Sequence, residues 1–197
     1  MEKSIPLSSH NDSDITHVKK MLLKLLNKPI NNESLSQKEF DFIIDIIDMY
    51  PDILDEICFK PDKFYELMNK NENLATQIIF KLAKSNIIVG YLLMFVEKPC
   101  SINSLKVFNR LVQSIDLPSF YIKCYLGHII NEYKEELNLE LKLRLGKLIS
   151  FFILNLLELK HITVDIIPTS INIILDENDK NPDTIQLKKT FISSLRN

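Results

Sequence analysis

Hydrophobic residues recur every three or four positions along most of this chain, which is the period of an amphipathic α-helix. In residues 101–115 they form one apolar stripe, made by Leu105, Phe108, Leu111, Val112 and Ile115. Ser101 is placed to cap this helix. Pro118 disfavours the α region for Leu117 and suits the first turn of a new helix. We therefore predict two helices that fold back on each other through Asp116-Leu117-Pro118.

The same period predicts further helices on both sides of this hairpin. They cover roughly 12–28, 36–49, 52–59, 62–69, 74–84, 87–96 and 141–159, with one more opening at Thr163 and a last one at Asn181-Pro182. We expect the first to stop at the Lys28-Pro29 step and the second to begin with a capping box. Residues 87–96 are apolar on nearly every side and should be central. Residues 176–181 read as a polar loop.

One stretch gives a conflicting signal. Leucines at positions 137 to 145 alternate with polar residues, a pattern typical of a half-buried strand. The residues are Leu, Glu, Lys and Arg, which are good helix formers without β-branching. A helical stripe also continues from here to Leu159. We therefore predict a helix.

Composition supports an all-α fold. The 197 residues include only 3 glycines, which argues against turn-rich β architectures and phosphate-binding loops, since both use positions with positive φ. We predict about nine to ten short helices in sequential antiparallel pairs, arranged like a solenoid. They should form a single domain over residues 12–197, after a polar and disordered N-terminus at 1–11.

The charge balance limits the classes of partner. A formal net charge of −2 provides no global field for a nucleic-acid backbone. The longest apolar runs are too short to span a bilayer, and the first residues lack the apolar segment of a secretion signal. Three unpatterned cysteines suit a reducing compartment. We expect a cytoplasmic protein, with the nucleus as a second location, that contacts neither membrane, nucleic acid nor a small molecule.

The sequence predicts no catalytic constellation. The four histidines stand far apart, without cysteine or carboxylate at metal-ligand spacing: His10, His17, His128 and His161. Glu132, Glu135 and Glu136 are better explained as solvated residues at a helix end than as an acid and base. We therefore predict a protein that is not an enzyme and has no metal or cofactor.

The hairpin holds the residues with both a structural and a partner-binding interpretation. Asn109 should bond the backbone of the 116 turn, with contact to a partner as the alternative. Arg110 and Asp116 could pair across the hairpin. Tyr121 and Tyr125 lie one helical turn apart and are most simply core, or else aromatic anchors for a partner. The candidate partner-binding set is Asn109, Arg110, Asp116, Leu117, Pro118, Tyr121 and Tyr125.

The hairpin sequence also resembles a known family. Phe108-Asn109-Arg110-Leu111, Asp116-Leu117-Pro118 and Phe120 resemble the domain near the C-terminal end of the eleventh subunit of the CCR-NOT mRNA deadenylase complex. The order of elements agrees upstream, through Lys60-Pro61-Asp62-Lys63 and the Asn-rich joint 69–73, and downstream, through 143–157 and Lys160-His161-Ile162-Thr163. The resemblance spans about residues 35–175.

The resemblance implies a non-catalytic adaptor subunit that acts in mRNA decay and gene-expression regulation. It implies contacts with the large scaffold subunit and the tenth subunit, and a helical surface offered to other proteins. Family members carry a long N-terminal docking region, whereas few residues precede the recognised stretch here, which leaves assembly into the complex open. A nucleic-acid-binding helical solenoid is the alternative from another class, and an all-α hydrolase is a third.

Overall fold

The computed structural model describes residues 12–50, 52–57, 59–83, 85, 87–167 and 170–194. Within these ranges the chain forms eleven α-helices, one 3₁₀ turn and no strand, so the predicted all-α class is confirmed. The N-terminus that we expect to be disordered lies outside the described residues. The sequence predicts one domain, and the chain divides into two compact units, Met1–Ile87 and Ile88–Asn197.

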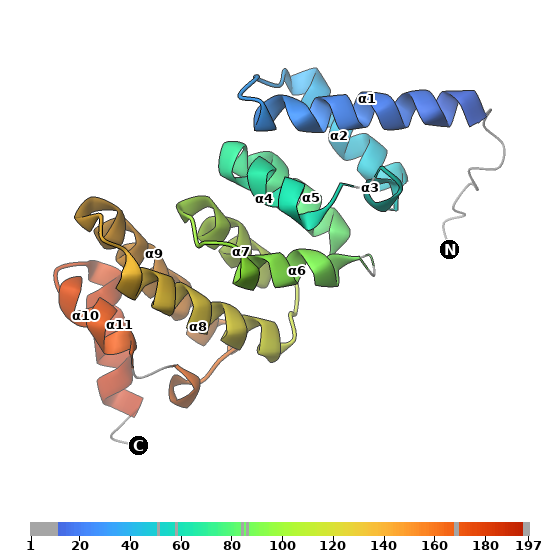
Figure 1. Ribbon diagram of the computed structural model, residues 1–197. Coiled ribbons are helices and arrows are strands. Elements are labelled where there is room, and N and C mark those ends of the chain that lie inside the picture. The colour runs from blue at the N-terminus through green and yellow to red at the C-terminus, as the bar shows by residue number, and fades with distance from the viewer. Residues whose placement is uncertain are drawn as a thin grey trace. The chain divides into compact units, whose positions relative to one another are not determined.

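The described residues of the first unit form five α-helices. They are α1 (Asp12–Ile30), α2 (Gln37–Met49), α3 (Ile53–Glu56), α4 (Pro61–Lys70) and α5 (Glu72–Leu82). Helices α1 and α5 each pack on both α2 and α4, so these four helices enclose one core (Figure 1). That core is mainly aliphatic and includes the fully buried Leu22, Leu26, Ile43, Ile47, Leu67 and Ile78. An apolar stripe on each helix therefore finds its partner within the unit.

Helix α1 continues past the proline at which we expect it to stop. Pro29 lies in its last turn, where a missing backbone donor removes only one intrahelical bond. Asn32 has φ 64°, a left-handed conformation that asparagine tolerates. The amides of Asn32 and Glu33 donate to the carbonyls of Pro29 (3.0 Å) and Lys28 (2.8 Å). These two bonds form a Schellman motif, so the chain reversal at Asn32 ends the helix.

The predicted capping box at the start of α2 is confirmed. The Glu39 amide donates to Ser36 Oγ, and the Ser36 amide donates to Glu39 Oε2 at 2.9 Å. Glu39 also accepts a bond of 2.6 Å from Lys28 Nζ, which ties the cap to the end of α1. Glu39 therefore completes the cap of α2 and also holds the end of α1 against it.

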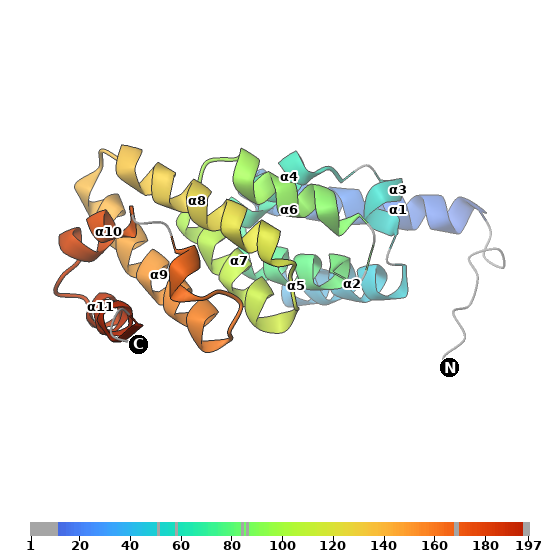
Figure 2. The same ribbon diagram turned by 90° about the horizontal axis from the view of Figure 1, so that it is seen from below.

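The second unit is organised around one long helix. Its elements are α6 (Ile88–Glu97), α7 (Ile102–Ser114), α8 (Ser119–Glu135), α9 (Leu139–Glu158), the 3₁₀ turn η2 (Val164–Ile166), α10 (Ile171–Glu177) and α11 (Pro182–Ser194). Helix α9 packs on α7, α8, α10 and α11, while α6 packs on α8 (Figures 1 and 2). The helical prediction for the leucine-rich stretch is confirmed, because Leu139 opens α9.

Helix α6 is less central than its composition predicts. Val89 and Leu93 on it are 46% and 38% exposed, whereas Tyr91, Leu92 and Phe95 are buried. At 20 residues, α9 is twice as long as α6 and can contact four helices along its length. The long helix α9 therefore lies in the middle of this unit, although α6 has the larger share of apolar residues.

The C-terminal third differs from the prediction at two points. Thr163 opens the short 3₁₀ turn η2, and α10 begins only at Ile171. Pro168, which we expect to lie in or near a first helical turn, is outside the described residues. Within the predicted polar loop, Asp176 and Glu177 are still helical. Asn178 is buried, and its amide donates to Tyr133 Oη and to the Ile174 carbonyl. The predicted helix from Pro182 is confirmed.

Candidate functional site

The candidate site begins at the hairpin of α7 and α8. Ser101 Oγ accepts from the Ser104 amide at 3.0 Å, and Ser104 Oγ accepts from the Ser101 amide at 2.8 Å, so the predicted cap is confirmed. Pro118 is the N-cap of α8, and Leu117 before it is buried, at 6% exposed. The chain therefore reverses at residues 116–118, as predicted.

Four aromatic rings from four helices support this hairpin from inside. They are Phe95 on α6, Phe108 on α7, Tyr125 on α8 and Phe152 on α9. The Phe108 ring centroid lies 4.0 Å from that of Tyr125, 5.1 Å from Phe95 and 6.0 Å from Phe152. Tyr125 is fully buried. Tyr125 therefore lies in the core. Its ring packs against its aromatic neighbours inside the hairpin and does not face solvent.

Asn109 bonds a different partner from the one that the sequence suggests. Its Oδ1 accepts from Asn155 Nδ2 at 3.1 Å, which links α7 to α9 rather than to the 116 turn. Asn109 is half-buried. A side chain on a helix points outward toward the neighbouring helix and not along the helix axis toward a distant turn. Asn109 therefore bonds Asn155 on α9 and not the 116 turn.

A histidine ties the joint after α9 to the last turns of α7. His161 Nε2 donates to the Val112 carbonyl at 3.0 Å, and its Nδ1 lies 3.9 Å from Asp116 Oδ1. The sequence suggests Arg110 as the partner of Asp116, but the side chain beside this exposed carboxylate is His161, at a distance too long for a hydrogen bond. His161 follows α9 and reaches back to the end of α7, a contact that spans 49 positions and has no local signal.

Asn109 and Arg110 line a surface pocket between α7 and α9. Its volume is about 200 Å³, and the remaining lining residues are Leu105, Lys106, Leu148 and Phe151. Phe151 is 42% exposed, and Arg110 is exposed. The pocket thus combines an exposed aromatic ring and aliphatic walls with two cationic side chains.

The other candidate residues lie at the tip of the hairpin. Asp116 and Pro118 are exposed, and Tyr121 is half-buried. Phe120 is 64% exposed and packs edge-on against Tyr121, with ring centroids 5.6 Å apart. The tip therefore offers an aromatic pair to solvent beside the turn.

Sequence reasoning missed the contribution of α9 to this site. Leu148, Phe151 and Asn155 repeat at intervals of three and four, so they share one face of the helix. That spacing could identify the face, but it could not show that α7 packs there. The pairing of α7 with α9 skips α8 in the sequence.

The cysteine and histidine side chains near the start of α7 and on α8 are held by burial or by hydrogen bonds. Burial raises the pKa of the Cys100 thiol to about 11, so Cys100 is protonated near neutral pH and is a poor nucleophile. His128 Nε2 donates to the Lys98 carbonyl at 2.8 Å. Among the described residues, no three His, Cys, Asp or Glu side chains are grouped to hold a metal ion. In the same residues, no helix is both long and apolar enough to cross a membrane.

These observations define a class, an all-helical protein with a surface pocket that combines apolar and charged side chains. A family model described as CCR4-NOT transcription complex subunit 11 matches residues 68–191. The match covers more than half of the chain, so the protein belongs to this family of complex subunits. It begins later and ends later than the resemblance at 35–175, and it contains all seven candidate residues.

Proposed function

We propose that this protein is a non-catalytic interaction subunit of the CCR4-NOT complex and acts in mRNA decay and gene-expression regulation. The observation that carries the proposal is the family match over residues 68–191, which includes the hairpin, α9 and both sides of the α7–α9 pocket. The subunits that we propose as contacts are the large scaffold subunit and the tenth subunit. The proposed location is the cytoplasm, with the nucleus as a second site.

The α7–α9 pocket is our proposed contact for a protein ligand. Phe151 and Leu148 provide apolar surface, and the pocket also has the positive charges of Lys106 and Arg110. Aromatic residues and arginine are the side chains that most often dominate protein interfaces. Such a surface suits a ligand segment with an apolar side chain next to acidic ones.

Affinity purification of the tagged full chain from native cells, read by mass spectrometry, tests the assignment. We expect CCR4-NOT subunits among the enriched proteins. Recovery of the chain without any of them, at an expression level close to the native one, would refute the proposal.

A pair of variants tests the pocket within the same purification. Phe151→Ser should reduce recovery of the protein ligand, because it removes the exposed ring from the pocket. Ile192→Ser on α11 is the matched control, since Ile192 is also about half exposed, at 53%, and lies outside the pocket. Equal recovery with both variants would remove the pocket from the proposal. Circular dichroism of both proteins checks that they remain folded.

Asn109 needs a separate test, because it could act in the fold or at the interface. If its bond to Asn155 is structural, Asn109→Ala and Asn155→Ala should each lower stability by about 0.5–1.5 kcal/mol, and the double variant should lose less than their sum. If Asn109 contacts a ligand, its variant should melt as the parent does and lose binding. Urea unfolding combined with the same purification separates the two roles.

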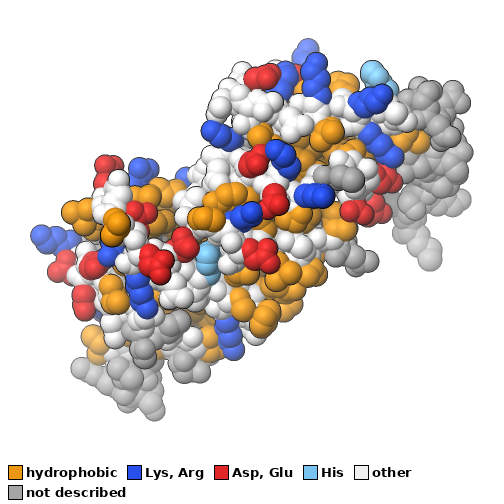
Figure 3. Space-filling view, viewed as in Figure 1, with side chains coloured by type: hydrophobic (Ala, Val, Ile, Leu, Met, Phe, Trp, Pro, Cys, Tyr) orange, Lys and Arg blue, Asp and Glu red, His pale blue; other side chains and the backbone are white. Residues whose placement is uncertain are grey.

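The absence of catalysis and of RNA affinity completes the proposal. On the face in Figure 3, acidic and basic side chains are interspersed, which does not favour a phosphate backbone. The pure protein should neither shorten poly(A) nor hydrolyse nucleotides. A salt-dependent shift of single-stranded RNA at submicromolar protein would support the nucleic-acid alternative instead.

A further inference from the structure

The α7–α9 pocket has charges of one sign on its walls. Its two ionisable lining residues are Lys106 and Arg110, which lie four positions apart and therefore on one face of α7. Neither α7 nor the stretch 141–157 of α9 contains an aspartate or a glutamate. All charged side chains on these parts of the two helices are therefore positive.

Two further cations continue this surface along α9. Arg144 lies four positions before Leu148, and Lys147 lies four positions before Phe151, so each is one helical turn from an apolar lining residue. Both cations are exposed, and neither forms an ion pair in the part of the chain that the structure describes. Their charge is therefore accessible to a ligand that extends from the pocket toward the start of α9.

The amide of Asn109 adds a hydrogen-bond donor to the pocket. Its Oδ1 atom is occupied by the 3.1 Å bond from Asn155 Nδ2, so Nδ2 is the atom left for a ligand. This Nδ2 makes no hydrogen bond among the described residues, and it is not a buried atom. Ammonium, guanidinium and amide N–H groups donate and do not accept. The side chains of the pocket therefore suit a ligand group that has acceptors only.

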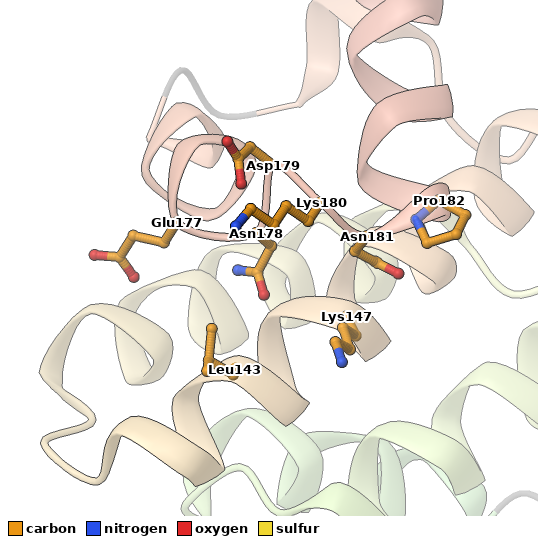
Figure 4. A pocket seen from close by; sticks show the side chains of 8 residues that line it. All are labelled: Leu143, Lys147, Glu177, Asn178, Asp179, Lys180, Asn181 and Pro182. Atoms are coloured by element: carbon orange, nitrogen blue, oxygen red, sulfur yellow. The ribbon is translucent and has the colours of Figure 1, made fainter.

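The larger pocket of the same unit lacks this uniform charge. Its volume is about 390 Å³, and it lies between α9 and the segment 177–182. Figure 4 shows Glu177 and Asp179 on the loop side of this pocket and Lys147 on α9, and Lys180 is also a lining residue. An anion there would meet repulsion as well as attraction. The α7–α9 pocket is therefore the better site for an anionic group.

The two lining cations match a dianion better than a single carboxylate. A phosphate monoester carries a charge of about −1.5 to −2 at pH 7 and has three strong acceptor oxygens. Arginine can bind such a group through two parallel hydrogen bonds, and lysine binds it as a point charge. Beside the charges, Leu148 and the 42% exposed Phe151 provide apolar surface. A phosphorylated residue next to an apolar one would use both parts of the pocket.

A nucleic acid matches these charges less well than a short peptide does. Its phosphates recur along the strand, so binding needs a continuous track of cations. On α9 the positive stretch lies between two exposed acids, Glu140 before it and Glu158 after it. Asp116, just beyond the end of α7, is also exposed. The positive surface is therefore short, which favours a ligand with one phosphate.

We propose that the α7–α9 pocket binds a segment of a partner protein in which a phosphorylated residue stands next to an apolar one. The phosphate accepts hydrogen bonds from Lys106, Asn109 Nδ2 and Arg110. The apolar side chain packs on Leu148 and Phe151. Phosphorylation of the partner therefore controls its binding. The inference rests on the proposed interaction function and adds the chemistry of the ligand and its regulation.

Synthetic dipeptides test the proposal on the isotope-labelled full chain by NMR. The probe is N-acetyl-phosphoseryl-leucinamide, and the matched control is the same dipeptide without the phosphate. We expect the phosphorylated probe to cause saturable shifts of the Asn109 side-chain amide and the Phe151 backbone amide. The control should bind at least ~10-fold more weakly, as expected when a hydrogen bond between charged groups is lost. Inorganic phosphate, which lacks the apolar side chain, should also bind more weakly than the probe.

A charge variant identifies a group that holds the phosphate. Arg110→Gln should weaken binding of the phosphorylated probe by at least ~10-fold and leave binding of the unphosphorylated dipeptide unchanged. Lys123→Gln is the control and should change neither, because Lys123 is exposed on α8 and does not line the pocket. Circular dichroism of both variants checks that they remain folded.

The proposal is overturned if the probe causes no saturable shifts at Asn109 and Phe151, or if the two dipeptides bind equally. Inorganic phosphate that binds as tightly as the probe would also overturn it. Displacement of the probe by single-stranded oligo(A) at submicromolar concentration would support the nucleic-acid alternative instead. These measurements use the pure protein, so they can fail while the chain still co-purifies with CCR4-NOT subunits, and the purification can fail while the pocket binds the probe.

Discussion

The two units differ in where they place their polar side chains. Both join separate helices through ion pairs near the surface, such as Lys81 with Asp48 in the first and Lys142 with Glu177 in the second. The second also has hydrogen bonds between side chains in its interior. Ser150 and Thr184 are 3.0 Å apart and both fully buried, and the Tyr133–Asn178 bond is also buried.

The two cores also differ in the kind of side chain that they bury. The first unit buries mostly aliphatic side chains, whereas the second adds the cluster of Phe95, Phe108, Tyr125 and Phe152. Exposed ion pairs contribute little each, while an interior hydrogen bond leaves a costly unpaired group when one partner is removed. We therefore expect single substitutions to be more disruptive in the second unit, where the geometry of buried groups is more specific.

The largest effect should come from the aromatic cluster. Phe108→Ala should lower the free energy of unfolding by about 3–5 kcal/mol, because it leaves a cavity among three rings. Urea unfolding followed by circular dichroism measures this. Phe120→Ala, at a ring that is 64% exposed, is the control and should change stability by less than about 0.5 kcal/mol. An unchanged midpoint for Phe108→Ala would show that the cluster is not a centre of stability.

A pair of glycines should give effects of opposite sign. Gly146→Ala places a methyl group against the Asn178 amide and should cost about 1–3 kcal/mol by overpacking. A Cβ at Gly127 meets no atom within 4 Å, so Gly127→Ala should stabilise α8 by up to about 1 kcal/mol. Thermal unfolding of the two variants beside the parent decides this. Stabilisation by both would mean that Asn178 moves aside without cost.

Helix caps should matter equally in the two units. Ser36→Ala and Ser101→Ala each remove the acceptor of a capping box and should each cost about 0.5–2 kcal/mol. Capping is local, so we expect the difference between the two variants to be smaller than either loss in urea unfolding. A much larger loss for Ser36→Ala would show that the Lys28–Glu39 contact depends on its cap.

The smallest effect should be a pH dependence in the first unit. The hydrogen bond from Lys28, followed by that from the Ser36 amide, lowers the Glu39 pKa to about 2. The folded state then binds fewer protons than the unfolded one, so this contribution is present above the unfolded pKa near 4.5 and is lost as pH falls toward 2. Glu39→Gln should flatten the fall in melting temperature between about pH 5 and about pH 2. Glu33→Gln, at an exposed carboxylate, should leave the profile unchanged.

Helix boundaries were largely predictable because the signals that set them are local. Ser36 and Glu39, Ser101, and Pro118 each act within one turn of the chain. The predicted stop at Pro29 is wrong, because a proline in a last turn removes only one hydrogen bond. The helix is ended by the chain reversal at Asn32, three residues later. A proline thus predicts that a helix ends nearby, but it does not predict the residue at which the helix ends.

The candidate site was predictable only in part. Sequence similarity pointed to the hairpin with Asn109 and Arg110, and the family match includes it. The part of the pocket that α9 supplies, with Leu148 and Phe151, comes from a pairing between helices that are not neighbours in sequence. Likewise, Asn178 reads as a loop residue in the sequence, although Tyr133, 45 positions away, bonds it in the interior.

The sequence by itself determined the all-α class, the main helices and the reversal at residues 116–118, because periodicity, caps and prolines act over a few residues. The tertiary structure decided that α9 and not α6 lies in the middle of the second unit. It also decided that His161 bonds the end of α7 and that the Asn178 amide is buried. Those outcomes depend on which helix faces meet, and a face accepts many partners of similar hydrophobicity until packing and hydrogen bonding select one.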